Sequence, residues 1–267
     1  MTLPNFIIIG AMKTGTTSLH RYLEQHPDVC VSSIKETDFF LGEEAFAHGL
    51  DWYESLFERD VAAVGEASPN YTKRHLWSAV PERIAAVVPD VKLIYVVREP
   101  IERLVSHYIH NYSHGRENRS IDKALMEEPG YLLTSSYAHQ LDPFIERFGV
   151  DRILVLDSAD LDQSTATSMR TVFDHLSVTN RIADRLEYER HHSSDGKRRR
   201  SIVDRRIPIK KVRGLLRLVL PRALTDPRPI GRPEISATTH DMLVERLRPD
   251  IDRFRSLTGK PFAEWSV

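Results

Sequence analysis

A buried strand that runs into a glycine- and threonine-rich turn, and from there into a helix, is the feature that most constrains this chain. Residues 6–10 read FIIIG, a short apolar run rich in β-branched residues, and residues 10–17 read GAMKTGTT. The segment 17–26 then repeats its apolar residues at helical spacing. Backbone N–H groups at a helix start have no partner within the helix, and the helix dipole adds partial positive charge. The arrangement therefore predicts that a phosphate-like anion binds against the turn.

The residue types in this turn suit an anion. Gly10 and Gly15 let the backbone approach a ligand closely, and Lys13 adds a full positive charge. The neighbouring residues offer further N–H groups and hydroxyls, and we predict that they contact the same ligand: Thr14, Thr16, Thr17 and Ser18. The turn is not the nucleotide triphosphatase loop G-x-x-x-x-G-K-S/T, because Thr16 occupies the lysine position and the lysine comes earlier.

Two more apolar runs, KLIYVV at 92–97 and RILVL at 152–156, have the composition of strands buried on both faces of a parallel sheet. Segments with helical spacing separate and follow these runs, at 100–112, 136–148, 166–176 and 236–257. Alternating strands and helices predict an α/β fold: a single P-loop-like domain over 1–267, with a central, mostly parallel sheet flanked by helices.

Composition narrows the class of protein. The chain has 267 residues, 41% of them apolar, which is enough for one large core, and its formal net charge of −1 argues against binding polyanions through a bulk field. The single cysteine, Cys30, excludes an internal disulfide and lies in an apolar run that reads as a buried strand. No apolar run reaches the ~18 residues of a spanning helix, and no secretory leader is recognisable. We expect a cytoplasmic protein without a transmembrane segment.

One stretch departs from the pattern. Between residues 190 and 213 there are ten Lys or Arg and two acidic residues, and several prolines follow. We predict a basic, lid-like excursion at about 189–232, either a solvated loop or a segment that meets an anionic ligand. The stretch has no aromatic residues interleaved with its charges, so we expect no nucleic-acid partner.

The turn and a second segment together resemble a known family. The GxxKTGTT arrangement resembles the 5′-phosphosulfate loop of sulfotransferases that use 3′-phosphoadenosine 5′-phosphosulfate (PAPS). The segment REPIERLVSHY, which begins at Arg98, is similar to their 3′-phosphate motif R-x-P-x-x-R-x-x-S-x-Y, with Ser106 at the serine position. A bare phosphate suits a forked guanidinium and a hydroxyl. Arg103 also matches the motif, and we favour a surface charge for it over a phosphate contact.

Three other segments are similar to the sulfotransferases that act on heparan sulfate. They are SSIKETDFF at 32–40, GEASPNYT at 65–72, and a loop and helix at 231–265 that end in GKPFAEW. Ala67 departs from that group's E-K-S/T-P pattern, where lysine grips an acidic sugar chain, and this puts a heparan-like acceptor in doubt. The resemblance therefore covers nearly the whole chain except the basic excursion, but it does not identify the acceptor.

The resemblance implies a reaction and roles for residues. A sulfuryl group would move in line from PAPS to a hydroxyl or amine of a carbohydrate, glycolipid or small metabolite, without a metal. Lys13 would stabilise the leaving group, and Glu36 would take the acceptor's proton, with Asp38, His107 and His110 as rival bases. The implied acceptor-binding residues are Lys35, Tyr71 and His107. The implied donor-binding residues are Lys13, Thr14, Gly15, Thr16, Thr17, Ser18, Arg98, Ser106 and Arg232.

Two other classes of function remain open at this stage. A P-loop nucleotide kinase or hydrolase would explain the strand, turn and helix, and Asp157 at the end of RILVLD would then be its metal-binding aspartate. A non-catalytic protein that binds anions or nucleic acid would explain the clustered arginines. A kinase needs magnesium to bridge phosphates, so activity in EDTA separates it from a sulfotransferase. The sequence does not determine the oligomeric state.

Overall fold

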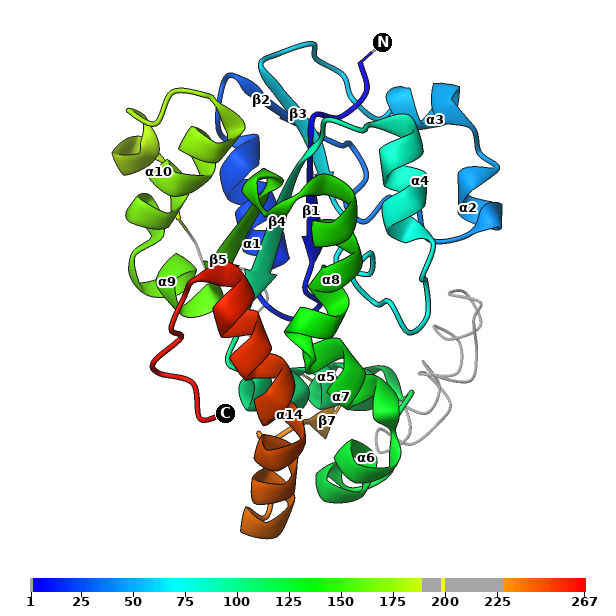
Figure 1. Cartoon of the computed structure of the whole chain (residues 1–267), viewed down its shortest axis with the longest axis vertical. Helices are drawn as coiled ribbons and strands as arrows, with labels where there is room; N and C mark the ends of the chain where they lie inside the picture. Colours follow the sequence, from blue (N-terminus) through cyan, green and yellow to red (C-terminus); the bar gives the residue numbers. More distant parts are fainter. Residues whose placement is uncertain (1, 189–197, 200–227) are drawn as a thin grey trace, which may run out of the picture.

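Five parallel strands in the order β2-β3-β1-β4-β5 form the centre of the molecule (Figure 1). The computed structural model describes residues 2–188, 198–199 and 228–267. The strands are β1 (Phe6–Gly10), β2 (Val29–Val31), β3 (Ala63–Ala67), β4 (Lys92–Val97) and β5 (Ile153–Asp157). The fold class predicted from the sequence, a mostly parallel sheet flanked by helices, is confirmed.

Helices connect the strands. In chain order they are α1 (Thr16–Glu24), α2 (Glu43–Phe46), α3 (Leu50–Glu54), α4 (Val80–Val87), α5 (Pro100–His114), α6 (Ile121–Glu127), α7 (Pro129–Ser135), α8 (Tyr137–Phe148), α9 (Ser158–Gln163), α10 (Thr165–Leu176) and α14 (Ala237–Thr258). The described residues also form two short 3₁₀ helices, η1 (Val150–Arg152) and η2 (Ala183–Arg185). Within the described residues no helix is both long and apolar enough to span a bilayer.

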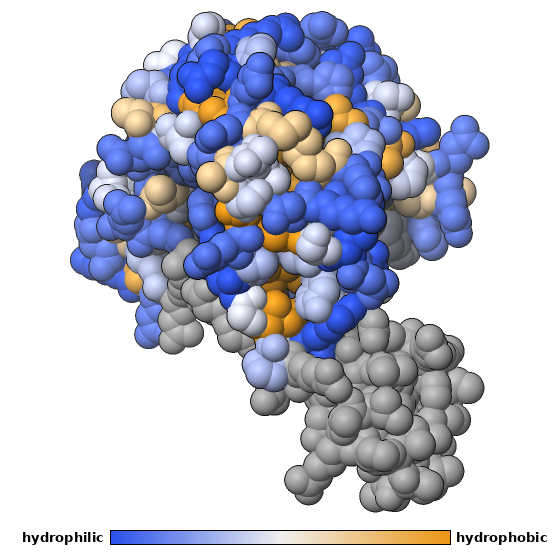
Figure 2. All heavy atoms as spheres, turned by 90° about the horizontal axis from the view of Figure 1, so that it is seen from below, coloured by the Kyte–Doolittle hydropathy of each residue, from blue (hydrophilic) through white to orange (hydrophobic). Residues whose placement is uncertain are grey.

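The sheet is buried on both faces, because alternate residues of each strand enter different clusters. Ile7 and Ile9 of β1 pack with residues of α4, α5, α8 and α14, whereas Phe6 and Ile8 pack with residues of α1 and α10. Figure 1 shows α1, α9 and α10 on one side of the sheet and α4 and α8 on the other. The lower end of the molecule is mostly hydrophilic, with hydrophobic residues only in scattered patches (Figure 2).

The sequence did not predict β3, and its composition explains why. Two central residues, Gly65 and Glu66, interrupt the apolar pattern, yet all five residues of the strand are buried. Gly65 pairs with Phe6 of β1, and a Cβ there would lie 2.4 Å from the Phe6 carbonyl oxygen. Glycine therefore lets β3 pair closely with β1.

The described ends of the basic excursion lie together. Strand β6 (Arg198–Arg199) pairs antiparallel with β7 (Arg228–Pro229). Arg199 donates to the hydroxyl of Tyr112 on α5 at 2.9 Å, and its guanidinium lies 4.0 Å from the centre of that ring. Residues 189–197 and 200–227 lie outside the described part of the chain, so a lid within 189–232 stays a prediction.

Gly65→Ala should lower the melting temperature. The new methyl group overlaps the Phe6 backbone, and overpacking of this kind costs roughly 1–3 kcal/mol. Thermal unfolding followed by circular dichroism measures the effect. Gly231→Ala is the control, because its Cβ would meet no atom within 4 Å. Equal melting temperatures for Gly65→Ala and the unsubstituted chain would contradict the close pairing of β1 and β3.

Candidate active site

A cavity of about 1670 Å³ lies at the carboxyl edge of the sheet, and segments that follow all five strands form its walls. The order of the strands fixes the order of these segments: residues after β2 and β3 lie at one end, those after β1 and β4 in the middle, and those after β5 at the other. Of the sequence-predicted site residues, eleven line the cavity: Lys13, Thr14, Gly15, Thr16, Thr17, Ser18, Lys35, Glu36, Arg98, Ser106 and Arg232.

The predicted phosphate turn joins β1 to α1. Gly15 precedes the first residue of α1 with φ 99°, and Lys13 has φ 74°, so both backbones are left-handed. The first turn of α1 holds no acidic residue, and its N-cap residue, Gly15, has no side chain that could cap the helix. The start of α1 therefore brings the partial positive charge of its backbone N–H groups to the cavity.

Thr14 contributes to the turn in a different way from its neighbours. Its hydroxyl lies 2.7 Å from the Ala11 carbonyl oxygen and 2.9 Å from that of Val96 on β4, and the residue is buried. The side chain thus ties the turn to the adjacent strand. What remains at Thr14 for a ligand is its backbone N–H group.

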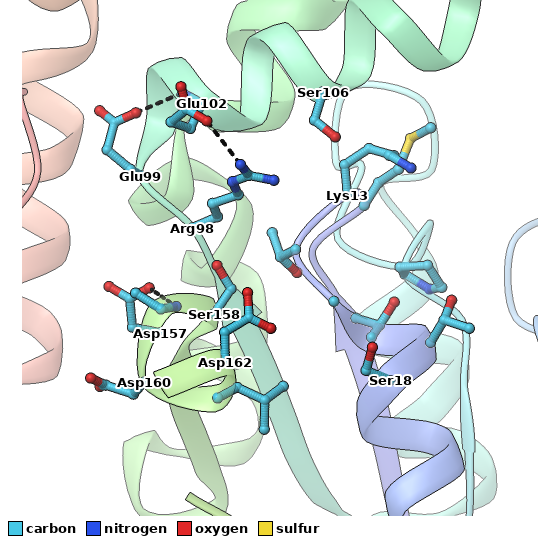
Figure 3. A pocket seen from close by; sticks show the side chains of 18 of the residues that line it. Lys13, Ser18, Arg98, Glu99, Glu102, Ser106, Asp157, Ser158, Asp160 and Asp162 are labelled. Atoms are coloured by element: carbon cyan, nitrogen blue, oxygen red, sulfur yellow. Dashed lines mark hydrogen bonds and ion pairs between the residues drawn. The ribbon is translucent and has the colours of Figure 1, made fainter. Parts of the chain in front are cut away.

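A second cationic group faces the turn across the cavity. Figure 3 shows Arg98 at the end of β4 and Ser106 on α5 projecting toward Lys13 and the start of α1. Arg98 and Arg232 both contact the carboxylate of Glu102, at 2.8 and 2.5 Å. Arg98 and Arg232, which are far apart in the sequence, thus meet at the Glu102 carboxylate. This carboxylate offsets part of their positive charge.

Arg103 does not carry the surface charge that the sequence favoured. It is fully buried, and its guanidinium donates to Ser135 Oγ at 2.6 Å and to the Tyr131 carbonyl oxygen at 2.8 Å. A third bond reaches the carbonyl oxygen of Met12, next to Lys13, at 3.4 Å. Burial lowers the pKa of Arg103 to about 10. Arg103 therefore supports the phosphate turn from behind, because its donors require acceptors that only the folded chain brings together.

The segment after β2 carries Lys35 and Glu36 into the cavity. The Lys35 ammonium lies 2.5 Å from the Glu36 carboxylate, and the Glu36 N–H donates to the carbonyl oxygen of Ala67 at the end of β3. Glu36 has φ 62° and Asp38 has φ 51°. Left-handed backbone at residues other than glycine costs free energy and persists where surrounding contacts enforce it.

The contacts that enforce this backbone converge on Glu66, a carboxylate with no exposed surface. Four hydroxyl groups donate to it: Thr37 and Ser68 at 2.6 Å, Tyr53 and Tyr71 at 2.8 Å. Thr37 lies between Glu36 and Asp38, so Glu66 holds the loop in place. The Tyr71 hydroxyl is engaged here, and Tyr71 does not line the cavity.

His107 also lies outside the cavity lining. Its Nδ1 is 3.4 Å from the Arg103 guanidinium, and its ring packs edge-on against Tyr131. Burial and the nearby cations hold the pKa of His107 well below its usual range, so the imidazole is neutral. Tyr137 is also buried, and its hydroxyl donates to the Arg98 carbonyl oxygen at 2.7 Å. Both side chains lie behind the wall.

Asp38, the rival base, lies next to the cavity without lining it. Its backbone N–H donates to Ser68 Oγ at 3.0 Å, and the amide of Asn70 lies 3.3 Å from both of its carboxylate oxygens. Burial raises the pKa of the Asp38 carboxyl to about 6, against the pull of the Asn70 amide.

Several lining residues carry no signal in the sequence. Lys73 follows β3, and Arg116 follows α5. A lysine or arginine in a loop is usually a solvated charge, so residue type alone does not separate these side chains from the surface. The C-terminal segment 260–265 lines the cavity as well, and only its resemblance to the heparan-type segment singled it out.

The alternative role for Asp157 does not fit its contacts. One carboxylate oxygen accepts from the Ala159 N–H at 2.9 Å and caps α9, and the other accepts from the Trp265 indole at 2.8 Å. Both oxygens therefore serve the fold. Among the residues that the structure describes, no group of three His, Cys, Asp or Glu side chains is placed to hold a metal ion.

Asp38→Asn should stabilise the protein by an amount that grows with pH. The raised pKa means that ionisation of Asp38 costs stability in the folded state, a cost absent below the ordinary value of 3.8 and complete above about 6. The gain in melting temperature should therefore increase between about pH 4 and pH 7. The same change at the exposed Asp60 is the control. A gain that stays constant across this range would contradict the raised pKa.

Comparison with known proteins identifies the family to which the chain belongs. Residues 3–205 match the family model of the sulfotransferase domain. Heparan sulfate glucosamine 3-O-sulfotransferase 3B1 of Mus musculus is 32% identical over 197 residues, which are 70% of this chain and 49% of that protein. The membrane-associated sulfotransferase kil1 of Dictyostelium discoideum is 36% identical over 125 residues, 45% of this chain and 26% of that protein.

A solved structure shares the fold over the full length. The sulfotransferase of Alicyclobacillus acidocaldarius superposes with a TM-score of 0.72 at 24% identity and covers 100% of both chains. The curated relatives are longer proteins, and this chain spans 49% of the mouse enzyme and 26% of kil1. Because the family model matches most of the chain, the resemblance inferred from the sequence is confirmed: the chain belongs to the sulfotransferase domain family.

Proposed function

We propose that this protein transfers a sulfuryl group from PAPS to a hydroxyl or amine of a carbohydrate-type acceptor. The observation that carries the proposal is that two separate cationic groups line one cavity: the turn at 13–18, and Arg98 with Ser106 and Arg232. PAPS has two phosphate-bearing ends, and sulfotransferases of this family use it as donor. Membership of the family leaves the nucleotide kinase and the non-catalytic binding protein without support.

The donor's two ends are assigned by chemistry. The 5′-phosphosulfate takes the turn, where the start of α1 supplies backbone N–H groups with partial positive charge and Lys13 supplies a full charge. The 3′-phosphate takes Arg98, Ser106 and Arg232, because guanidinium groups bind phosphate in bidentate fashion. Glu102 already bridges the two arginines, so an arriving phosphate competes with this carboxylate or shares their remaining N–H donors.

Transfer requires positioning and two helpers. Sulfuryl transfer resembles phosphoryl transfer, in which an in-line geometry and stabilisation of diffuse charge account for most of the catalysis. Lys13 stabilises the negative charge that grows on the bridging oxygen as the bond to sulfur breaks. Glu36 takes the proton of the acceptor as its oxygen or nitrogen attacks.

Glu36 is preferred over Asp38 and His107 because it lines the cavity, whereas they do not. His110 also lines the cavity, but it lies one helical turn after Ser106 on α5, on the side assigned to the 3′-phosphate. Lys35 is paired with Glu36 and orients its carboxylate toward the acceptor. Tyr71 and His107 act behind the wall rather than in contact with the acceptor. The acceptor is assigned as a carbohydrate because the mouse relative, by its name, acts on heparan sulfate.

Arg98→Ala should weaken the binding of adenosine 3′,5′-bisphosphate much more than the binding of adenosine 5′-phosphate. Loss of a charge-assisted contact to the 3′-phosphate reduces affinity by roughly tenfold or more. Calorimetric titration of both nucleotides in EDTA measures the difference. Arg152→Ala, which removes a surface arginine paired with Asp90, is the control. Equal losses of affinity for the two nucleotides would contradict a contact between Arg98 and the 3′-phosphate.

Glu36→Gln should keep the affinity for adenosine 3′,5′-bisphosphate while turnover falls. Loss of a general base costs roughly 10²- to 10⁴-fold in rate and leaves the phosphate contacts intact. Release of the bisphosphate from PAPS, followed over a panel of saccharide acceptors, measures turnover. Glu44→Gln, at an exposed position of α2, is the control. A collapse of nucleotide affinity in Glu36→Gln would show that Glu36 supports the fold or the donor instead.

A further inference from the structure

The charges that line the cavity are distributed unevenly along the sheet. The β5 end carries an excess of acidic residues, which we call the acidic wall: Asp157, Asp160, Asp162 and Glu264 stand against Lys260, and Glu99 after β4 adds to them. The β2 and β3 end carries a basic wall, made of Lys35, Lys73 and Arg116. Glu36 is the one carboxylate at the basic end that lines the cavity within the described residues, and Lys35 neutralises it. The proposed donor phosphates bind between the two walls.

Lys73 is the central residue of the basic wall. Its backbone is fixed in the turn after β3, where its N–H donates to Asn70 and its carbonyl accepts from Leu76 and Trp77. The side chain is half-buried and forms no ion pair at contact distance with any residue of the described chain. Burial, reinforced by Arg103, lowers the pKa of Lys73 to about 8.

Arg116 extends the basic wall. It follows Gly115, which ends α5 with φ 74°, and its charge lies near enough to Lys73 to depress the pKa of that lysine. Nearby Arg119 is held by the Glu117 carboxylate at 2.7 Å, whereas Arg116 has no carboxylate partner in the described part of the chain. The charge of Arg119 therefore stabilises its own loop, whereas the charge of Arg116 can interact with a ligand in the cavity.

Lys73 and Arg116 have no carboxylate partners in the described chain, and their charges repel each other. Partial burial adds a desolvation cost for Lys73, whereas Arg116 is exposed. An anion that enters the cavity would offset the repulsion and the desolvation cost. The donor's phosphates cannot be this anion, because they are assigned to the turn after β1 and to Arg98 beyond β4. The neighbouring carboxylates Glu36 and Asp38 act on Lys73 only through space.

We propose that Lys73 and Arg116 form an acceptor subsite for a carboxylate or sulfate group, so that the acceptor is an anionic saccharide held with its reacting hydroxyl beside Glu36. This assignment rests on the proposed function. It specifies that the acceptor is negatively charged, and it names the residues that bind the charged group. Lys73 supplies the specificity, because it is the more buried of the two cations and lies in the same wall as Glu36.

Matched ligands test this subsite. The first probe is a tetrasaccharide of alternating glucuronate and N-acetylglucosamine, and the second is the same compound with its carboxylates reduced to alcohols. A third carries O-sulfates on the reduced compound, which distinguishes sulfate from carboxylate. Each is titrated by calorimetry into the full chain, with saturating adenosine 3′,5′-bisphosphate and without it.

The unsubstituted protein should bind one of the anionic probes roughly tenfold or more tightly than the neutral one. Lys73→Gln should abolish that preference, and Arg116→Gln should reduce it, while the affinity for the bisphosphate is unchanged in both. Lys123→Gln is the control, because Lys123 is exposed and pairs with Glu127 outside the cavity.

Equal affinity for the anionic and neutral probes, including no measurable binding of any, would overturn the subsite. A preference that survives in Lys73→Gln would overturn it as well. Failure of the proposed function looks different, because the bisphosphate itself would then not bind, whatever the saccharide titrations show.

Discussion

The position of β1 at the centre of a parallel sheet is the constraint on which the rest of the structure depends. Hydrogen bonds to β3 on one side and β4 on the other bury the whole strand. The turn that leaves its carboxyl end therefore opens between the segments that follow both neighbours. The Glu36 loop is anchored to β3, and Arg98 directly follows β4, so a single strand order brings both within reach of one ligand.

Buried polar contacts hold these segments at the cavity. Arg103 links α5 and α7 to the carbonyl of Met12, and the four hydroxyl bonds to Glu66 join the turn after β3 to Thr37 and Tyr53. Both are ionisable groups without exposed surface, and such groups are tolerated only when their hydrogen bonds are made. The rigidity that a transfer reaction requires thus comes from groups that do not line the cavity.

Local pattern predicts the parts of the fold and the site that depend on local chemistry. Residues 6–10, 92–97 and 152–156 are apolar and β-branched, so their burial in a parallel sheet follows from the sequence. The turn at 13–18 is predictable from residue types at a helix start, and Arg98 and Ser106 from their resemblance to a family motif.

The rest depends on long-range contacts. Strand β3 escapes prediction because two of the four hydroxyl groups that make Glu66 tolerable in a strand, those of Thr37 and Tyr53, come from distant residues. Arg103 was assigned to the surface because its acceptors lie in α7 and in the turn after β1, far from it in the sequence. Lys73 has no local signature at all. Lys73 becomes a candidate acceptor-binding residue because it is partly buried and has no carboxylate partner in the described chain. The residue type alone reveals neither property.

A crystal structure with adenosine 3′,5′-bisphosphate, grown in EDTA, tests the central claim most directly. The predicted result is one nucleotide that spans the cavity, with its 5′-phosphate on the N–H groups of residues 13–18 and its 3′-phosphate contacting Arg98 and Ser106. A nucleotide bound elsewhere, or one whose 3′-phosphate points into solvent away from Arg98, would contradict the assignment of the two cationic groups to one donor.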